Sequence, residues 1–281
     1  MTDLICDGNS LYARCFYAAK GNPFDVVPIF FRAALRMIDP ELMGTQVDRT
    51  MFCWDGGQKK PKERAPRPPE YNSLRPVAMD NVRDLLGSIN VRIEGYEADD
   101  LIATAALSST ADKVIVASGD KDLQQLHGNR VVYFDLNTKG FLNERRIVGK
   151  WGVKKPIQVA IALAIQGDSA DKITGIKGWG PKKVRQLFQA VKPEMQLAES
   201  LAVIQDQIPE DKLPEFYESL GLTLLDTNIK GIPCPRAIEF IPASELINYG
   251  LEECESYYAS VAHHYDVDGD LLCESEVENW Q

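Results

Sequence analysis

Several features that would place the chain in a membrane, secreted or zinc-binding class are missing from its sequence. There is no run of about 18 apolar residues, so no transmembrane helix is predicted. The polar start, Met1-Thr2-Asp3, lacks the features of a signal peptide, and we therefore expect a soluble cytoplasmic protein. The six cysteines form no C-x-x-C pair or zinc spacing, which predicts reduced thiols.

Basic residues are absent from the last part of the chain. Residues 244–281 contain ten acids and no Lys or Arg, so this stretch carries the whole net charge of −10. Residues 1–243 then contain 31 acids and 31 bases. We expect 244–281 to be an acidic tail with modest helical content, either solvated or available to a partner protein.

Acids are crowded into the four residues from Glu97 to Asp100, directly before an apolar, alanine-rich segment, 101–107, that is predicted to be a helix. One carboxylate would be enough to interact with the N-terminal N–H groups of that helix. Three carboxylates repel one another unless a cation lies between them, and Mg²⁺ or Mn²⁺ is the usual choice in oxygen-rich sites. The crowding therefore predicts a divalent-metal site if other segments contribute acids.

Three of the predicted strands lead into acids. Strands are predicted at 4–7, 50–55, 91–94, 113–118 and 131–135. The first two end at Asp7 and Asp55, and the fourth is followed by Asp120 and Asp122. Their alternation with helices predicts an α/β region over residues 1–150, with a mainly parallel central sheet flanked by helices. Such sheets bind ligands at the carboxyl ends of their strands, although acids there also serve as turn residues.

Residues 58–75 differ from their surroundings, with six Lys or Arg, two Glu, four Pro and a single aromatic residue, Tyr71. Proline at this density opposes a regular helix, so a mobile basic loop with short extended or helical pieces is predicted within 57–77, before a helix at about 79–88. A solvated linker is the usual alternative, but the loop follows an acid-ended strand and would lie over the expected site. Its cations are Lys59, Lys60, Lys62, Arg64, Arg67 and Arg75.

The later region, 151–243, is predicted to be mostly helical. After a helix at 156–166, residues 172–192 contain six bases and no acids. Three glycines between 175 and 180 imply a tight turn whose N–H groups can approach a phosphate. A plain turn between helices is the alternative, and the flanking bases favour contact with a DNA backbone. The candidate contacts are Lys177, Gly178, Gly180, Lys182 and Lys183.

Nine acids from separate segments are candidate metal ligands: Asp7, Asp55, Glu97, Asp99, Asp100, Asp120, Asp122, Asp168 and Asp171. Two divalent ions would explain so many hard oxygen ligands, and the absence of accompanying His or Cys argues against zinc. If metal neutralises the nine, 22 acids face 31 bases within residues 1–243, so the body of the protein is effectively basic.

These motifs resemble those of the 5′ nuclease family, which includes phage flap endonucleases and 5′ to 3′ exonucleases and the N-terminal nuclease domain of bacterial DNA polymerase I. The resembling segments are 5–9, 97–100, 119–122, 167–175 and 178–182, and they cover roughly residues 1–243 in family order. The resemblance implies two Mg²⁺ or Mn²⁺ ions and a helix-hairpin-helix-like DNA-binding turn with a bound K⁺. If the source is a phage, the protein would act in the host cytoplasm.

The resemblance also implies individual roles. Glu97, Asp99, Asp100 and Asp120 match a tightly held metal cluster, and Asp122, Asp168 and Asp171 match a weaker second site. Asp7 would act through a water, and Asp55 matches the acid after the family's second strand. Arg14 matches an arginine near the scissile phosphate, so the expected catalytic residues are Arg14, Glu97 and Asp120.

One position departs from the family pattern. The family commonly has Pro-Glu-Tyr-Lys followed by an Arg, where the lysine assists the phosphate and the tyrosine stacks on a base. This chain has Asn72 in place of the lysine, between Tyr71 and Arg75. The change removes a charge that could stabilise the transition state. A lysine or arginine between residues 59 and 67 could compensate.

The expected function is hydrolysis of DNA phosphodiesters near a 5′ end, at a flap or at a single-strand/duplex junction, in replication or repair. The expected protein is a monomer whose acidic tail could bind a replication partner. Two alternatives stay open at this point. One is a branched-DNA-binding protein that cleaves poorly because of Asn72, and the other is a metal-dependent ribonuclease, which would leave residues 172–192 unexplained.

Overall fold

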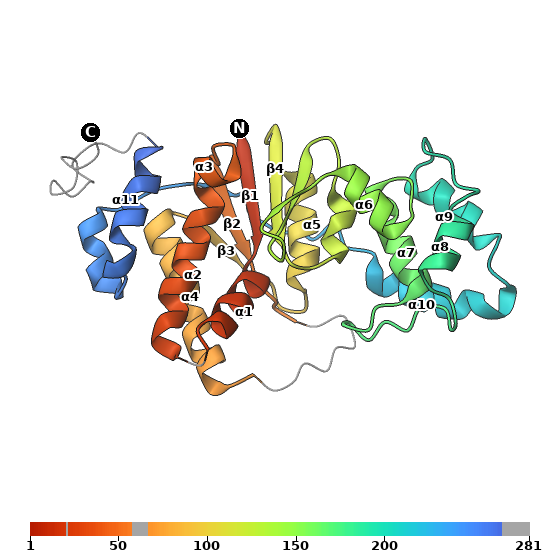
Figure 1. Ribbon diagram of the computed structural model, residues 1–281, viewed down its shortest axis with the longest axis horizontal. Coiled ribbons are helices and arrows are strands. Elements are labelled where there is room, and N and C mark those ends of the chain that lie inside the picture. The colour runs from red at the N-terminus through yellow and green to blue at the C-terminus, as the bar shows by residue number, and fades with distance from the viewer. Residues whose placement is uncertain (21, 58–66, 266–281) are drawn as a thin grey trace.

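A mostly parallel sheet organises the computed structural model, which describes residues 1–20, 22–57 and 67–265 (Figure 1). The strand order is β3-β2-β1-β4-β5-β6, with β7 paired to β2. The strands are β1 Thr2–Asp7, β2 Arg49–Cys53, β3 Ile89–Val91, β4 Lys113–Ser118, β5 Val131–Asp135, β6 Gly140–Leu142 and β7 Arg236–Ala237. Only β6 and β7 run antiparallel to their described partners. The predicted fold class is confirmed, since β3 pairs with β2, β2 with β1, β1 with β4 and β4 with β5, all in parallel.

Helices cover both faces of the sheet. One face carries α1 Gly8–Ala18, α2 Pro23–Ile38, α3 Pro40–Met43, α4 Pro69–Leu86 and α11 Glu255–His263, and the other carries α5 Ala98–Ser108, α6 Glu144–Trp151 and α7 Val159–Gln166. Successive strand residues point to opposite faces, so Leu4 packs with the first helix group and Ile5 with the second. Because both faces of the sheet are buried, the central residues of β1 and β4 are apolar without interruption.

The helical region after α7 extends the second face. It contains α8 Pro181–Leu187, α9 Leu197–Gln205 and α10 Leu213–Thr223, with a short 3-10 helix at Glu210–Lys212 (η3). Two further 3-10 helices, Asp122–Leu126 (η1) and Pro156–Gln158 (η2), precede α7. Phe216 of α10 belongs to the same hydrophobic cluster as the strand residue Ile5. A division of the chain near residue 150 therefore stays a prediction, because apolar packing is continuous across it. Among the described helices, none is both long and apolar enough to cross a membrane.

The predicted basic loop is wrong from Pro69 onward, where the chain enters helix α4. Pro69 lies at the start of the helix, where a missing N–H costs nothing. Pro76 lies inside it, and its cost is offset by the buried side chains of Tyr71, Ala78 and Val82, among others. Tertiary burial has outweighed the local preference of proline. Lys59, Lys60, Lys62 and Arg64 lie outside the described residues.

The helical content expected after residue 244 is present as far as Tyr265, but the prediction of a solvated tail over these residues is wrong. Residues 243–265 form the 3-10 helices η4 Ala243–Tyr249 and η5 Glu252–Cys254 and then α11, which packs on α2 (Figure 1). Tyr258 is buried and stacks on Phe31, with ring centroids 6.0 Å apart. Apolar residues recur at 246, 251, 254, 258 and 261, and this spacing buries them while the acids stay outside. The rest of the predicted tail, 266–281, lies outside the described residues.

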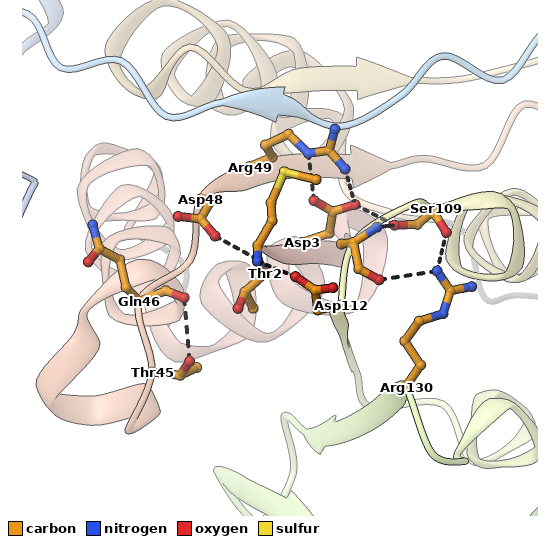
Figure 2. A network of polar contacts seen from close by, with 11 residues as sticks. Thr2, Asp3, Thr45, Gln46, Asp48, Arg49, Ser109, Asp112 and Arg130 are labelled. Atoms are coloured by element: carbon orange, nitrogen blue, oxygen red, sulfur yellow. Dashed lines mark hydrogen bonds and ion pairs between the residues drawn. The ribbon is translucent and has the colours of Figure 1, made fainter.

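A buried ion pair joins β1 and β2 at the end of the sheet where these two strands begin (Figure 2). Asp3 is fully buried and accepts two hydrogen bonds from the Arg49 guanidinium, at 2.7 and 2.8 Å. Ser109, in the turn before β4, donates to the same carboxylate at 2.6 Å. The contact therefore joins β1, β2 and the connection into β4, and it shows how an acid in this fold is satisfied without metal.

Candidate metal centre

Acids from three neighbouring strands and one helix surround a pocket of about 250 Å³ at the opposite edge of the sheet. β1 lies between β2 and β4, so residues that follow these three strands must meet. The described residues that line the pocket are Asp7, Asn9, Ser10, Ala13, Asp55, Arg67, Tyr71, Glu97, Ala98, Asp99, Gly119 and Asp120. Five of the nine predicted metal ligands are thus brought together.

Asp7 is positioned by the junction of β1 and α1. One of its carboxylate oxygens accepts the backbone N–H of Ser10 at 2.9 Å and caps the helix, and the other accepts the hydroxyl of Ser118 at 2.7 Å. Gly8 allows this turn, since a Cβ there would lie 2.5 Å from the buried Trp54 ring. Burial raises the pKa of Asp7 to about 6, Asp55 and Asp120 add to the rise, and the two hydrogen bonds oppose it. The pocket is therefore electrostatically costly without a cation.

This cost predicts a pH-dependent effect of Asp7→Asn on the metal-free protein. The pKa of Asp7 is raised from 3.8 when unfolded to about 6 when folded, so the destabilisation develops as the pH rises from about 4 to 6 and is complete above pH 6. We expect Asp7→Asn to raise the free energy of unfolding by roughly 2 kcal/mol at pH 8 with a chelator present, and by close to nothing below pH 4. Urea unfolding at several pH values measures this. The exposed Asp211→Asn is the control, and an equal gain at pH 4 and pH 8 would contradict the explanation.

The crowded acids before α5 do not act mainly as helix caps. Asp55 accepts the N–H of Ala98 at 2.9 Å and so supplies a cap from another segment. Glu97 occupies the N-cap position, but its side chain makes no capping bond. Glu97 and Asp99 are 3% and 7% exposed and both line the pocket. Their arrangement supports the expectation that they face a cation.

A second acidic group lies next to the first. Carboxylate oxygens of Asp120, Asp122 and Asp171 all come within 4.8 Å of one another. The backbone N–H of Asp122 donates to Asp120 at 3.0 Å, which fixes the spacing of these two carboxylates. Mg²⁺ binds oxygens at 2.0–2.1 Å and Ca²⁺ at 2.3–2.6 Å, so ligand oxygens on one ion lie within about 5 Å of one another. The group has the oxygen chemistry and the spacing that a divalent ion requires.

Asp168 adds a buried carboxylate whose partners are only partly supplied by the protein. One oxygen accepts Lys121 Nζ at 2.5 Å and the Ala170 N–H at 2.9 Å. The other, Oδ2, is buried and has no hydrogen-bond partner within the described parts of the chain. Such an oxygen is costly unless it binds a cation or accepts a hydrogen bond from water. Lys121 was missed in the sequence, although its place between Asp120 and Asp122 could have indicated it.

The remaining predicted site residues are placed differently. Asp100 does not line the pocket and accepts the N–H of Asp226 at 2.8 Å, so its role as a ligand stays a prediction. Arg14 donates to Asn137 and lies beside Gly119, at the edge of the pocket. Tyr71 is 5% exposed and packs on Tyr12 and Phe16, which leaves little of its ring for base stacking.

The predicted DNA-binding turn lies between α7 and α8, and it makes well-defined internal contacts. Gly175 and Gly178 both have positive φ, at 65° and 80°. The N–H of Gly175 donates to Ser219 at 3.1 Å, and that of Lys177 donates to Glu215 at 3.0 Å, so the turn is attached to α10. Lys183 lies over the Trp179 ring at 4.8 Å. A helix-hairpin-helix-like role for Gly180, Lys182 and their neighbours stays a prediction.

Comparison with known proteins finds one matching family model and relatives of similar sequence. A family model described as "5'-3' exonuclease, N-terminal resolvase-like domain" matches residues 2–152. The chain is 30% identical over 236 residues to DNA polymerase I of Bacillus subtilis, covering 76% of this chain but only 26% of that protein. It is 28% identical over 243 residues to a 5'-3' exonuclease of Aquifex aeolicus, covering 80% of this chain and 82% of the relative.

Solved structures share the fold at low sequence identity. A T5 5'-exonuclease with bound zinc ions has a TM-score of 0.60 at 16% identity and covers 93% of this chain and 100% of that one. A T5 D15 flap endonuclease in complex with DNA and metal ions has a TM-score of 0.61 at 16% identity, covering 94% of this chain and 100% of that one. These likenesses establish the architecture described above.

Proposed function

Because the chain belongs to the 5′-3′ exonuclease family, we propose that it hydrolyses DNA phosphodiesters near a 5′ end, at a flap or at a single-strand/duplex junction. The single observation that carries this proposal is the pocket where five acids from four segments meet. The polymerase relatives suggest a place in DNA replication or repair.

The buried acids fit two Mg²⁺ or Mn²⁺ ions. Glu97, Asp99 and Asp120 would hold one ion, and Asp122, Asp168 and Asp171 the other, with Asp7 and Asp55 supporting the first set. Bound divalent ions would supply an activated water and neutralise charge on the phosphate. The carboxylates and the Ser118 hydroxyl that fixes Asp7 would keep the site in position before the substrate arrives.

Arg67 is the best-placed candidate for the charge that Asn72 does not supply. It is the one cation among the described residues that line the pocket. Its guanidinium lies 4.8 Å from the centroid of the Tyr71 ring and 5.6 Å from that of Tyr17, so the aromatic rings hold it in place. A planar guanidinium can donate two hydrogen bonds to phosphate oxygens. We assign Arg67 the phosphate contact that a lysine at position 72 would otherwise make.

This assignment predicts that Arg67→Ala lowers kcat on a 5′-flap substrate by about 100-fold, because a contact to developing charge is lost. Binding of the flap should change less than threefold. Adding Asn72→Lys to Arg67→Ala should restore part of the loss. Arg83→Ala is the matched control, because Arg83 lies on α4 and pairs with Asp80 and Asp84 at the surface. An equal loss in both arginine variants would contradict a specific role.

The alternative of a DNA-binding protein with weak cleavage rests on Asn72 alone. A labelled flap substrate with Mg²⁺ separates the two functions. Cleavage by the wild type supports the nuclease. Cleavage that is absent in the wild type and appears with Asn72→Lys supports the binding protein.

The turn between α7 and α8 would hold duplex DNA through its backbone. Lys177, Lys182 and Lys183 are exposed or half-exposed around Gly178, where an added Cβ would meet no atom within 4 Å. Such contacts carry no sequence information, so recognition would follow DNA shape, and affinity would fall steeply with salt. A K⁺ ion at this turn is part of the same proposal.

A further inference from the structure

A groove of about 500 Å³ lies between α1, α2, α3 and β5, away from the acidic pocket. Its apolar wall includes Leu11, Ile29, Met37, Leu42 and Phe134. Along α2 the wall extends from Ile29 to Met37, which is about 12 Å at the helical rise of 1.5 Å per residue. The groove is therefore long enough for several residues of an extended peptide.

The charged residues of the groove are all basic. Arg14, Arg32, Arg36 and Lys139 line it, and no acid is among the described residues that do so. Arg32 also faces Glu253 at 3.6 Å, whereas Arg36 is exposed in the last turn of α2. An apolar floor with cations around it suits an occupant that is both acidic and partly apolar.

The chain itself has such a segment. Residues 266–281 contain six acids, no Lys or Arg, and the apolar residues Val267, Leu271, Leu272, Val277 and Trp280. The segment follows Tyr265, whose hydroxyl donates to the carbonyl of Ile38 at 2.6 Å. His264 lies 3.6 Å from Glu41, which is the residue before Leu42 of the groove. The segment thus starts beside the rim of the groove, and 16 residues can reach about 50 Å when extended.

We propose that residues 266–281 dock in this groove within the same molecule. Arg14 lines the groove and also lies beside Gly119 of the acidic pocket, so a docked acidic segment would occupy a cation that DNA would otherwise meet. The docking does not depend on the proposed function. Its effect on DNA does, and the two are measured separately.

Disulfide trapping in the full chain tests the docking. Cys273 lies in the acidic segment, and Leu42 is 51% exposed at the rim. In a background with the exposed Cys234→Ser, mild oxidation of Leu42→Cys should link the new thiol to Cys273 within one molecule. The control is Leu107→Cys, which is 47% exposed on α5 at the other face of the sheet. We expect linkage at least tenfold faster at position 42, and equal rates or only intermolecular linkage would overturn the proposal.

Charge variants test the reason for docking. Arg36→Glu should slow the linkage of Leu42→Cys at least fivefold, while Arg36→Lys should leave it unchanged. An equal linkage rate in Arg36→Glu and Arg36→Lys would show that the cations do not attract the segment and would overturn the proposed recognition.

Replacing the six acids of residues 266–281 with amides should tighten binding to random duplex DNA three- to tenfold at low salt. If the DNA affinity is unchanged while the disulfide still forms efficiently, the docking stands, but the proposed competition between the segment and DNA is overturned.

Discussion

Asp120→Asn is expected to reduce cleavage of a 5′-flap substrate by at least about 1,000-fold, which is the largest effect on activity that the structure predicts. Asp120 lines the pocket with Asp7 and Glu97 and also lies within 4.8 Å of the Asp122 and Asp171 oxygens. It is therefore the carboxylate common to both acidic groups. Single-turnover cleavage with Mg²⁺ measures the chemical step directly.

Binding and folding controls make this result specific. Flap DNA should bind the Asp120→Asn variant about as well as the wild type, because one negative charge has been removed from an acidic pocket. Asp39→Asn is the matched control, since Asp39 is a buried acid that caps α3 outside the pocket. Near-normal cleavage by Asp120→Asn would contradict a metal site centred on this residue.

The largest expected effect on stability comes from Arg49→Ala, at the other edge of the sheet (Figure 2). The substitution leaves the Asp3 carboxylate buried, with a side chain 0% exposed, and without its guanidinium partner. Breaking a buried ion pair from one side costs about 3–5 kcal/mol, so we expect a loss of that size in the free energy of unfolding. Urea unfolding followed by circular dichroism measures it.

An exposed arginine provides the comparison. Arg83 pairs with Asp80 and Asp84, and its side chain is 52% exposed, so Arg83→Ala should cost less than about 1 kcal/mol. The double variant Asp3→Asn with Arg49→Ala should recover part of the loss, because the uncompensated charge is gone. Equal costs for Arg49→Ala and Arg83→Ala would contradict the importance of the buried pair.

Much of the fold could be predicted from the sequence because its signals are local. The apolar runs at β1 and β4 and the alternation of strands with helices indicated a parallel sheet, and parallel pairing is observed. The acids after β1, β2 and β4 were expected to meet because strand ends in such a sheet share one edge. Five of the nine candidate acids line one pocket, and the oxygens of three, Asp120, Asp122 and Asp171, lie within 4.8 Å of one another.

Two errors have the same physical origin. Proline density concealed α4, and acidic residues concealed the packing of residues 243–265, because in each case a local signal opposed burial that depends on distant residues. Tyr71 packs against α1, and Tyr258 stacks on Phe31 of α2. Such contacts join positions far apart in the chain, and no sequence window contains both partners.

The sequence by itself determined the fold class, the family resemblance and the set of acids, since these depend on residue type and spacing. Only the tertiary structure decided how each acid is used. It placed Asp55 as the cap of α5 and paired Asp168 with Lys121. It also separated Asp3, which is satisfied by Arg49, from the acids that line the pocket. The reason is that a buried carboxylate is costly or stable according to its partners, and folding alone brings the partners together.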